Sequence, residues 1–261
     1  MGIDVNISRC LLSAYRGGVD FSLTATLGRQ GMYISDADLQ RNLSDFGFWI
    51  QGEPNDRHEA ETRECRRIIA HGLGGKVQAH PAWPGCGFCE GFLGLLGAKE
   101  VESFDISDYE GATHIHDFSL PINEKFHHRY SVVLDAGTLE HVFNFPQAIA
   151  NCMMMTAKDG YVIEYVPTNN HCGHGFYQFS PELLFRVFSS DNGFAVRRMA
   201  LVQEDGGIQT EIADPASTGR IETNLSGGVY LLMIAQRVAM VPLFTKPVVQ
   251  SDYLSFWGWE K

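Results

Sequence analysis

Three aspartates stand where this sequence could bind a polar ligand. Asp105 and Asp135 end two short apolar runs, and Asp117 follows the extended segment 112–116. If these runs are parallel strands, their carboxyl ends meet at one edge of a sheet, which is where α/β proteins bind ligands. A carboxylate at such an edge accepts hydrogen bonds from ribose hydroxyls. The three positions together predict a nucleotide-type pocket, although any single aspartate can equally cap a following helix.

A glycine-rich turn supplies the second element of such a pocket. Gly85 and Gly87 precede a predicted helix at 90–96, and Asp105 follows at the spacing of about 20 residues that nucleotide-binding folds use. Glycine lets the backbone turn tightly and approach a ligand, and the chain holds 27 glycines. We therefore expect Gly85 and Gly87 to form a cofactor turn, although Gly-x-Gly before a helix is a common pattern.

The elements that must position these residues alternate from about residue 76 onward. The expected strands are 101–105, 131–135 and 161–166, and the expected helices are 90–96, 145–157 and 181–189. This alternation predicts right-handed βαβ units and a doubly wound parallel sheet, which two further strands at 194–202 and 228–235 close with a hairpin. We assign residues 76–261 to this α/β domain. Residues 1–75 are expected to form an N-terminal extension with a strand at 20–26 and helices at 35–46 and 56–71.

Charge and hydropathy exclude several classes of partner. With 20 Lys and Arg against 31 Asp and Glu, the net charge is −11 and the pI about 5.3, so the chain has no general attraction for nucleic acid or anionic membranes. Its longest apolar stretch, 228–245, is interrupted by Gln236 and Arg237 and is too short to span a bilayer. Six cysteines without a secretion signal are typical of reduced thiols in a cytoplasm. A cytoplasmic protein with a small-molecule partner is expected.

Several motifs in order along the chain resemble one enzyme family. They are Phe104-Asp105-Ile106-Ser107, His116-Asp117-Phe118, Leu134-Asp135-Ala136-Gly137-Thr138-Leu139-Glu140-His141-Val142 and Gly160-Tyr161-Val162-Ile163. The series is similar to that of class I S-adenosylmethionine-dependent methyltransferases and covers about residues 78 to 200. The stretch 169–183, together with 250–253, resembles a bacterial subgroup often associated with polysaccharide biosynthesis.

This resemblance implies a fold, a cofactor and a set of binding residues. The fold is a seven-stranded, mostly parallel Rossmann-like sheet with an antiparallel C-terminal hairpin, and the cofactor is S-adenosylmethionine. Asp105 would hold the ribose, Asp117 and Phe118 the adenine, and the glycine turn the methionine moiety. The whole implied set is Gly85, Gly87, Asp105, Ile106, Asp117, Phe118 and Asp135. The family's first motif has an acidic residue before its glycines, whereas Val77 to Pro84 supplies prolines instead.

The resemblance also implies which residues bind and activate the acceptor. It implies that Glu140 and His141 open the helix after the fourth strand and point toward the transferred methyl. There His141 would act as general base on a hydroxyl, because an unperturbed imidazole titrates near pH 6.5; a structural hydrogen bond that fixes the helix is the alternative. His171, His174 and Tyr177 would line the acceptor pocket. The implied activity is O-methylation of a sugar-containing or other small-molecule acceptor.

Two other chemistries compete for these residues. His171 and His174 could join Glu140 and His141 in a divalent-metal site, similar to that of the metal-dependent 2′-O-methyltransferases of small-RNA 3′ ends. Gly137 stands where that motif has its first Glu, so no metal is expected. Cys86 and Cys89 form a Cys-x-x-Cys that could be redox active or bind zinc, or simply be two small residues in a turn.

Two questions about assembly and catalysis stay open at the level of sequence. A methyltransferase fold with an atypical first motif could serve as a non-catalytic binding or scaffold protein. Trp257 and Trp259 could cover an apolar patch of their own chain or a neighbouring subunit, so a homo-oligomer is one of the alternatives.

Overall fold

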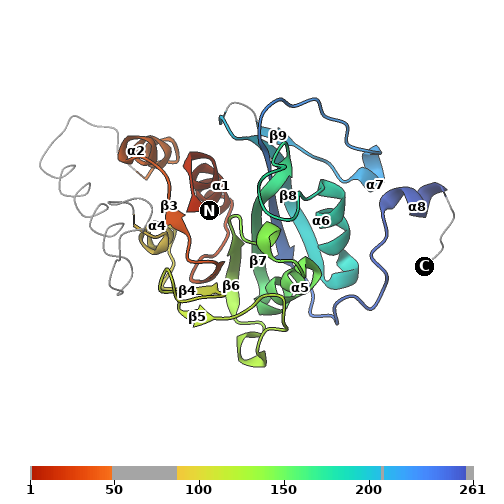
Figure 1. Cartoon of the computed structure of the whole chain (residues 1–261), viewed down its shortest axis with the longest axis horizontal. Helices are drawn as coiled ribbons and strands as arrows, with labels where there is room; N and C mark the ends of the chain where they lie inside the picture. The colour runs from red at the N-terminus through yellow and green to blue at the C-terminus, as the bar shows by residue number, and fades with distance from the viewer. Residues whose placement is uncertain (1, 49–86, 207–208, 257–261) are drawn as a thin grey trace, which may run out of the picture. The chain divides into compact units, whose positions relative to one another are not determined.

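The structure is a computed structural model (Figure 1) that describes residues 2–48, 87–206 and 209–256. The helix expected at 56–71, the segment before Gly85, Gly85 and Cys86, and the two C-terminal tryptophans lie outside these ranges. The chain divides into two compact units. The first comprises Met1–Asp117 with Tyr130–Ala136, and the second comprises Phe118–Arg129 with Gly137–Lys261.

The first unit is built on a parallel sheet. Its strands are β2 (Leu23–Leu27), β4 (Glu100–Asp105), β5 (His114–Ile115) and β6 (Tyr130–Asp135), in the order β5-β4-β2-β6. Every pairing among these strands is parallel. The central strand β2 has the sequence Leu-Thr-Ala-Thr-Leu and is buried after its first residue, as expected for a strand that is flanked on both sides.

The order of these strands creates a topological switch point. From β2 the chain moves to β4 and β5 on one side, and it then returns to place β6 on the other side of β2. Leu27, the last residue of β2, pairs with Phe104 of β4 and with Asp135 of β6. Asp105 in turn pairs with Ile115 of β5. The carboxyl ends of all four strands are therefore level.

The first 48 residues belong to this unit, which differs from the division expected at residue 75. Strand β2 lies between β4 and β6, and helix α1 (Val5–Arg16) comes before it in the chain. The segment treated as an extension thus supplies the central strand of the sheet. Sequence reading missed this because the pairing joins residues that lie far apart in the chain, and the short run at 23–27 gives no sign of its neighbours.

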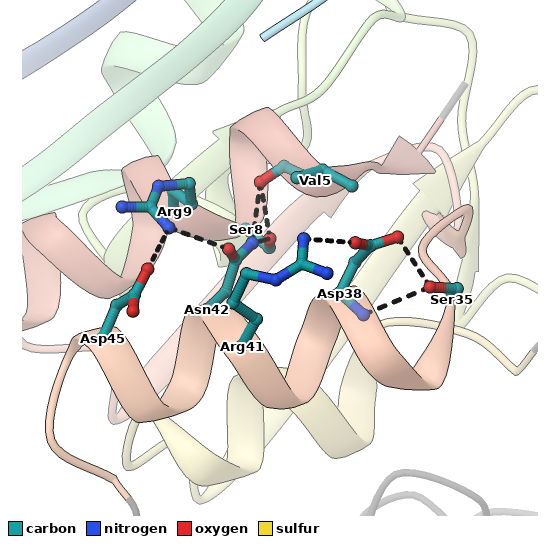
Figure 2. Close-up of polar contacts among 8 residues, drawn as sticks. All are labelled: Val5, Ser8, Arg9, Ser35, Asp38, Arg41, Asn42 and Asp45. Atoms are coloured by element: carbon teal, nitrogen blue, oxygen red, sulfur yellow. Dashed lines mark hydrogen bonds and ion pairs between the residues drawn. The ribbon is translucent and has the colours of Figure 1, made fainter.

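Helices α1 and α2 (Asp36–Asp45) are held together by a small polar network, which Figure 2 shows. Asn42 is 2% exposed and donates to the Val5 carbonyl at 3.0 Å and to Ser8 Oγ at 2.8 Å. Arg9 donates to Asn42 Oδ1 at 3.0 Å and to Asp45 at 2.6 Å. The Ser35 hydroxyl caps α2 by accepting from the backbone N–H of Asp38. The helix predicted at 35–46 is confirmed.

Within its described residues, the first unit also contains a short parallel pair of strands and one further helix. Strand β1 (Gly2–Ile3) pairs with β3 (Gly31–Met32). Helix α4 (Glu90–Leu95) lies where a helix was predicted at 90–96. These elements matter for the site because β3 follows directly from the turn at the end of β2.

The second unit contains an antiparallel sheet with helices. Its strands are β7 (Thr156–Asn169), β8 (Phe194–Gln203), β9 (Gln209–Glu211) and β10 (Val229–Arg237), in the order β7-β10-β8-β9. Its helical segments are η1 (Glu124–Phe126), η2 (Leu139–His141), α5 (Phe145–Met155), α6 (Pro181–Val187), η3 (Ser190–Asn192), α7 (Pro215–Thr218) and α8 (Ser251–Phe256). Strand β10 pairs antiparallel with both β7 and β8.

The predicted α/β class is confirmed. Parallel strands form the first unit, with helices α2 and α4 between β2 and β4 along the chain, and the antiparallel pair β8–β10 is the hairpin expected from runs 194–202 and 228–235. Ser180 caps α6 through its hydroxyl, and Pro181 begins that helix. None of the helices within the described ranges is long and apolar enough to cross a membrane.

Candidate functional site

The turn that follows the central strand β2 is anchored to the neighbouring strand. Gly28 has φ +69, and its N–H donates to the Phe104 carbonyl at 2.7 Å. The Thr26 hydroxyl donates to the Gly28 carbonyl at 2.8 Å, and the Gln30 side chain donates to the Leu27 carbonyl. A glycine with positive φ at the end of a parallel strand brings the backbone to the sheet edge without a side chain in the way.

Arg29 fastens this turn to two other segments of the first unit. Its Nε lies 2.6 Å from Glu90 Oε1 in α4, and it donates to the Glu110 carbonyl at 2.9 Å. The guanidinium also lies 4.0 Å from the ring centroid of Phe88. Because its guanidinium contacts Glu90, the Glu110 carbonyl and the Phe88 ring, Arg29 acts as a clamp that joins the turn after β2 to α4 and to the loop after β4.

The structure puts a different glycine turn at the strand end from the one expected. Gly87 accepts a hydrogen bond from the N–H of Met32, and Cys89 donates to the Gln30 carbonyl, so the segment beginning at Gly87 runs beside the turn 28–31. The glycine turn at the carboxyl end of β2 is Gly28 to Gly31, which sequence reading missed. Its only signal was a Leu-Gly-x-x-Gly pattern after a short run rich in threonine.

The predicted aspartates lie at the same strand edge. Asp105 is the last residue of β4, and its Oδ1 accepts from the N–H of Ser107 at 3.2 Å. Asp135 ends β6 and is 1% exposed, whereas Asp117 follows β5 by two residues and is half-buried. Ile106, next to Asp105, is 70% exposed. The edge thus combines carboxylates with an apolar side chain that faces solvent.

Phe118 belongs to the second unit and is less accessible than the resemblance implied. It is 4% exposed, and its carbonyl accepts from Asn151 Nδ2 at 3.1 Å. Burial of this extent leaves little of the ring to stack on a ligand.

In the second unit the predicted acceptor residues form a compact cluster. Glu140 is 0% exposed and lies in the short helical turn η2 rather than in a regular helix. Its Oε1 lies 3.3 Å from His174 Nε2 and 3.7 Å from His141 Nε2. The two imidazole ring centroids are 5.2 Å apart. We call Glu140, His141 and His174 the histidine–glutamate cluster.

A tight loop closes over this cluster. Gly175 has φ +74, and a Cβ built there would fall 2.7 Å from the Glu140 carbonyl oxygen. Phe176 donates its N–H to that same oxygen at 2.7 Å, and the Tyr177 hydroxyl donates to the Phe143 carbonyl at 2.7 Å. Only glycine fits such a close approach, so the loop holds His174 against Glu140.

His171 lies next to the cluster. Its ring centroid is 5.9 Å from that of His174 and 4.5 Å from that of Tyr230. Burial lowers the pKa of His171 below its usual value, against an opposing effect of Glu204. Burial, reinforced by His174, also lowers the pKa of His141. These two imidazoles are therefore neutral at pH 7, the form that can accept a proton or bind a cation.

A polar cavity of about 690 Å³ opens beside the end of β7. Carboxylates, amides and a guanidinium line it: Glu182, Glu222, Asp252, Gln178, Asn224 and Arg220. Arg220 and Asp252 form an ion pair at 2.6 Å. Gln178 also accepts from the backbone N–H of His171 at 2.8 Å, so one side chain links the cavity wall to the loop that carries the histidines.

The buried thiol of Cys89 does not favour redox chemistry. Cys89 is 1% exposed, and burial raises its pKa well above the usual value, with Glu90 adding to the effect. A reactive cysteine needs the opposite, a lowered pKa and access to solvent. The thiol oxidoreductase alternative therefore has no support at this position.

The sequence matches no protein-family model and no curated protein. Among solved structures, a methyltransferase from Burkholderia thailandensis, 1,6-didemethyltoxoflavin-N1-methyltransferase with S-adenosylhomocysteine bound, aligns over 90% of this chain and 78% of its own at 12% identity and a TM-score of 0.43. A possible histamine N-methyltransferase from Thermotoga maritima aligns over 89% and 91% at 12% identity, with a TM-score of 0.38.

A third solved structure is that of a polyamine synthase. The branched-chain polyamine synthase from Thermus thermophilus, in complex with N4-aminopropylspermidine and 5′-methylthioadenosine, aligns over 94% of this chain and 60% of its own at 12% identity and a TM-score of 0.40. Sequence identity and TM-scores this low do not indicate what this chain binds. The case for its function depends on its own residues.

Proposed function

We propose that this protein is an S-adenosylmethionine-dependent methyltransferase acting on a hydroxyl of a small-molecule, sugar-containing acceptor. One observation carries the proposal. The Gly28 turn, Asp105 and Asp135 end three neighbouring parallel strands at one level, at the point where the strand order reverses. Ligands of open α/β sheets bind outside the carboxyl ends of the strands at such a switch point.

Each residue of this edge has a role that suits the cofactor. The Asp105 carboxylate accepts hydrogen bonds from the ribose hydroxyls, and the exposed side chain of Ile106 packs on the adenine. Asp117 accepts from the adenine amino group. Gly28 to Gly31 brings backbone N–H groups to the methionine moiety, the role that the sequence resemblance implies for Gly85 and Gly87. Asp135, almost fully buried, lies at the end of the adjacent strand.

When bound, S-adenosylmethionine supplies a methyl group on a positively charged sulfur. The protein must then align a hydroxyl oxygen for in-line attack and remove its proton as the new bond forms. His141 suits the proton transfer because it is neutral at pH 7 and its side chain is 50% exposed. Glu140, 3.7 Å away, stabilises the imidazolium that results.

The polar cavity supports an acceptor with several hydroxyls. Its carboxylate and amide side chains offer hydrogen-bond acceptors and donors in the number that a sugar requires. With Gln178 shared between the cavity and the loop 171–178, His171, His174 and Tyr177 belong to the acceptor side of the proposal. An acceptor linked to polysaccharide synthesis is one member of this class.

Calorimetric titration with S-adenosylmethionine and S-adenosylhomocysteine tests the cofactor site. Wild-type protein should bind both, and Asp105→Ala should weaken binding roughly 10- to 100-fold, because a hydrogen bond to a charged group contributes about 1.5 to 3 kcal/mol. Asp108→Ala is the matched control, since Asp108 is exposed three residues further on. Folded wild-type protein that binds neither ligand would overturn the proposal and favour a non-catalytic scaffold.

A further inference from the structure

We infer that the histidine–glutamate cluster is a binding site for a divalent transition-metal cation. One Glu140 carboxylate oxygen and one nitrogen each from His141 and His174 all lie within 4.8 Å of one another. These residues come from two segments, η2 and the loop after β7, which approach each other at Gly175. Binding of the cation stands on the geometry of the second unit alone, whereas its use in catalysis rests on the proposed function.

The distances suit a single ion. Ligand atoms about 2.0 to 2.1 Å from a tetrahedral cation lie about 3.4 Å from each other. Glu140 Oε1 is 3.3 Å from His174 Nε2 and 3.7 Å from His141 Nε2. Both distances to Glu140 are therefore within a few tenths of an ångström of this value, whereas the two histidine nitrogens lie within 4.8 Å of each other, so the half-exposed His141 side chain would rotate to bring its nitrogen closer to that of His174.

Burial strengthens the case for a cation. The Glu140 side chain is 0% exposed, and a carboxylate withdrawn from water is costly unless positive charge or hydrogen bonds compensate it. The Nε2 atom of His174 is buried and makes no hydrogen bond within the described residues. A cation bound here would give the His174 nitrogen a partner and would meet the negative charge of the Glu140 carboxylate.

The site would keep open coordination positions. The His141 side chain is 50% exposed and that of His174 is 35% exposed, so solvent reaches part of the cluster. Catalytic metal sites use three protein ligands and leave the remaining position to water or substrate. In this chain that position would take an oxygen of the acceptor and lower the pKa of its hydroxyl.

The types of ligand atom in the cluster determine which metals it would prefer. Two imidazole nitrogens and one carboxylate favour Zn²⁺, Mn²⁺, Fe²⁺ or Co²⁺ over Mg²⁺ and Ca²⁺, which prefer oxygen ligands. Hydrogen bonds from the surrounding loop hold the ligands in place: Phe176 donates to the Glu140 carbonyl at 2.7 Å, and His174 donates its N–H to the His171 carbonyl at 2.9 Å. Such supporting contacts commonly orient metal ligands.

His141 cannot use the same Nε2 atom both as a ligand and as a base. A bound cation would transfer the activation of the hydroxyl from the imidazole to the metal. The metal experiment therefore also decides which of the two roles His141 has.

The test is calorimetric titration of the full-length chain, stripped of metal with chelator, using Zn²⁺, Co²⁺ and Mg²⁺ separately and without S-adenosylmethionine. We expect one Zn²⁺ per chain, an absorption spectrum for bound Co²⁺ typical of mixed nitrogen and oxygen ligands, and no comparable binding of Mg²⁺. His141→Ala and His174→Ala should each weaken Zn²⁺ binding by more than the roughly 10- to 100-fold that loss of an outer-shell partner costs.

His127→Ala is the control. His127 and His128 form a neighbouring pair with ring centroids 5.8 Å apart, and this substitution removes the pair without touching the cluster. Unchanged Zn²⁺ binding in His141→Ala and His174→Ala, loss of binding only in His127→Ala, or no binding by the wild type would each overturn the inference. Glu140→Gln is a further test, and because Glu140 is buried the two histidine variants decide the matter if this one fails to fold.

Failure of the metal site and failure of the proposed function give different results. Without a metal site, S-adenosylhomocysteine still binds and Zn²⁺ does not. Without a cofactor site, Zn²⁺ still binds at the cluster and S-adenosylhomocysteine does not.

Discussion

The strand edge of the first unit and the histidine–glutamate cluster of the second are built in different ways. At the strand edge, backbone pairing sets the positions of the side chains. Leu27 is in register with Phe104 and Asp135, so the residues that end the three strands lie at the same level. In the cluster, a loop does it, through the close approach of Gly175 to Glu140. Because backbone pairing sets the positions at the strand edge, side chains there can be changed without moving the edge. The histidine–glutamate cluster, in contrast, depends on the single close contact between Gly175 and Glu140.

Gly175→Ala tests that dependence and should have the largest effect. The new Cβ would lie 2.7 Å from the Glu140 carbonyl oxygen, at a φ of +74 that disfavours any side chain. Strain and overpacking together should lower the free energy of unfolding by about 2 to 4 kcal/mol and abolish Zn²⁺ binding, while S-adenosylhomocysteine still binds to the folded fraction. Denaturant unfolding and the two titrations measure these effects.

Gly173→Ala is the matched control for this prediction. It lies two residues away with no atom within 4 Å of its Cβ position. Equal losses of Zn²⁺ binding in both variants would show that the loop is generally fragile and that the contact with Glu140 is not special.

Gly28→Ala makes the corresponding change at the strand edge. An alanine at φ +69 costs about 1 to 2 kcal/mol of stability, and it moves the turn that faces the proposed cofactor. S-adenosylhomocysteine affinity should fall by roughly tenfold, since about 1.4 kcal/mol corresponds to one decade, with Zn²⁺ binding unchanged. Gly18→Ala serves as control, because Gly18 also has positive φ (+90) but has open space around it. A loss of affinity as large in Gly18→Ala would contradict a specific role for the turn.

Arg29→Lys should have the smallest effect and sharpens the same comparison. Lysine keeps the charge but lacks the planar group that meets Glu90, the Glu110 carbonyl and the Phe88 ring together. We expect a loss of about 1 kcal/mol of unfolding free energy, measured by chemical denaturation. In Arg9→Lys, where the side chain is 42% exposed, the change should stay within about 0.5 kcal/mol. If the two variants are equal, Arg29 is not a clamp.

Local sequence signals predicted those parts of the fold that depend on neighbours in the chain. Ser35 and Ser180 mark helix starts because their hydroxyls cap the backbone within three residues. The runs that end in Asp105 and Asp135 read as strands because their apolar residues are buried together. The sequence offers Glu140, His141, His171 and His174 as one alternative grouping, and the structure brings Glu140, His141 and His174 together.

Parts that depend on distant residues were not predictable in this way. Strand β2 has only five residues, and its place between β4 and β6 follows from hydrogen bonds to segments about 80 and 110 positions later in the register. For the same reason the local pattern at Gly85 and Gly87 predicts a glycine turn, whereas the glycine turn that follows β2 begins at Gly28. Gly87 does lie next to the turn, but only through its pairing with Met32.

The sequence by itself determined the α/β class, the aspartates that end the strands, and the residue types available for a hydroxyl acceptor or a cation. Only the tertiary structure decided which strand is central, which glycine turn lies at the carboxyl end of that strand, and which of the histidines meet Glu140. The physical reason is that capping and periodicity act over a few residues, whereas sheet order and the packing of a loop on a buried carboxylate are set by contacts between segments that the chain brings together only on folding.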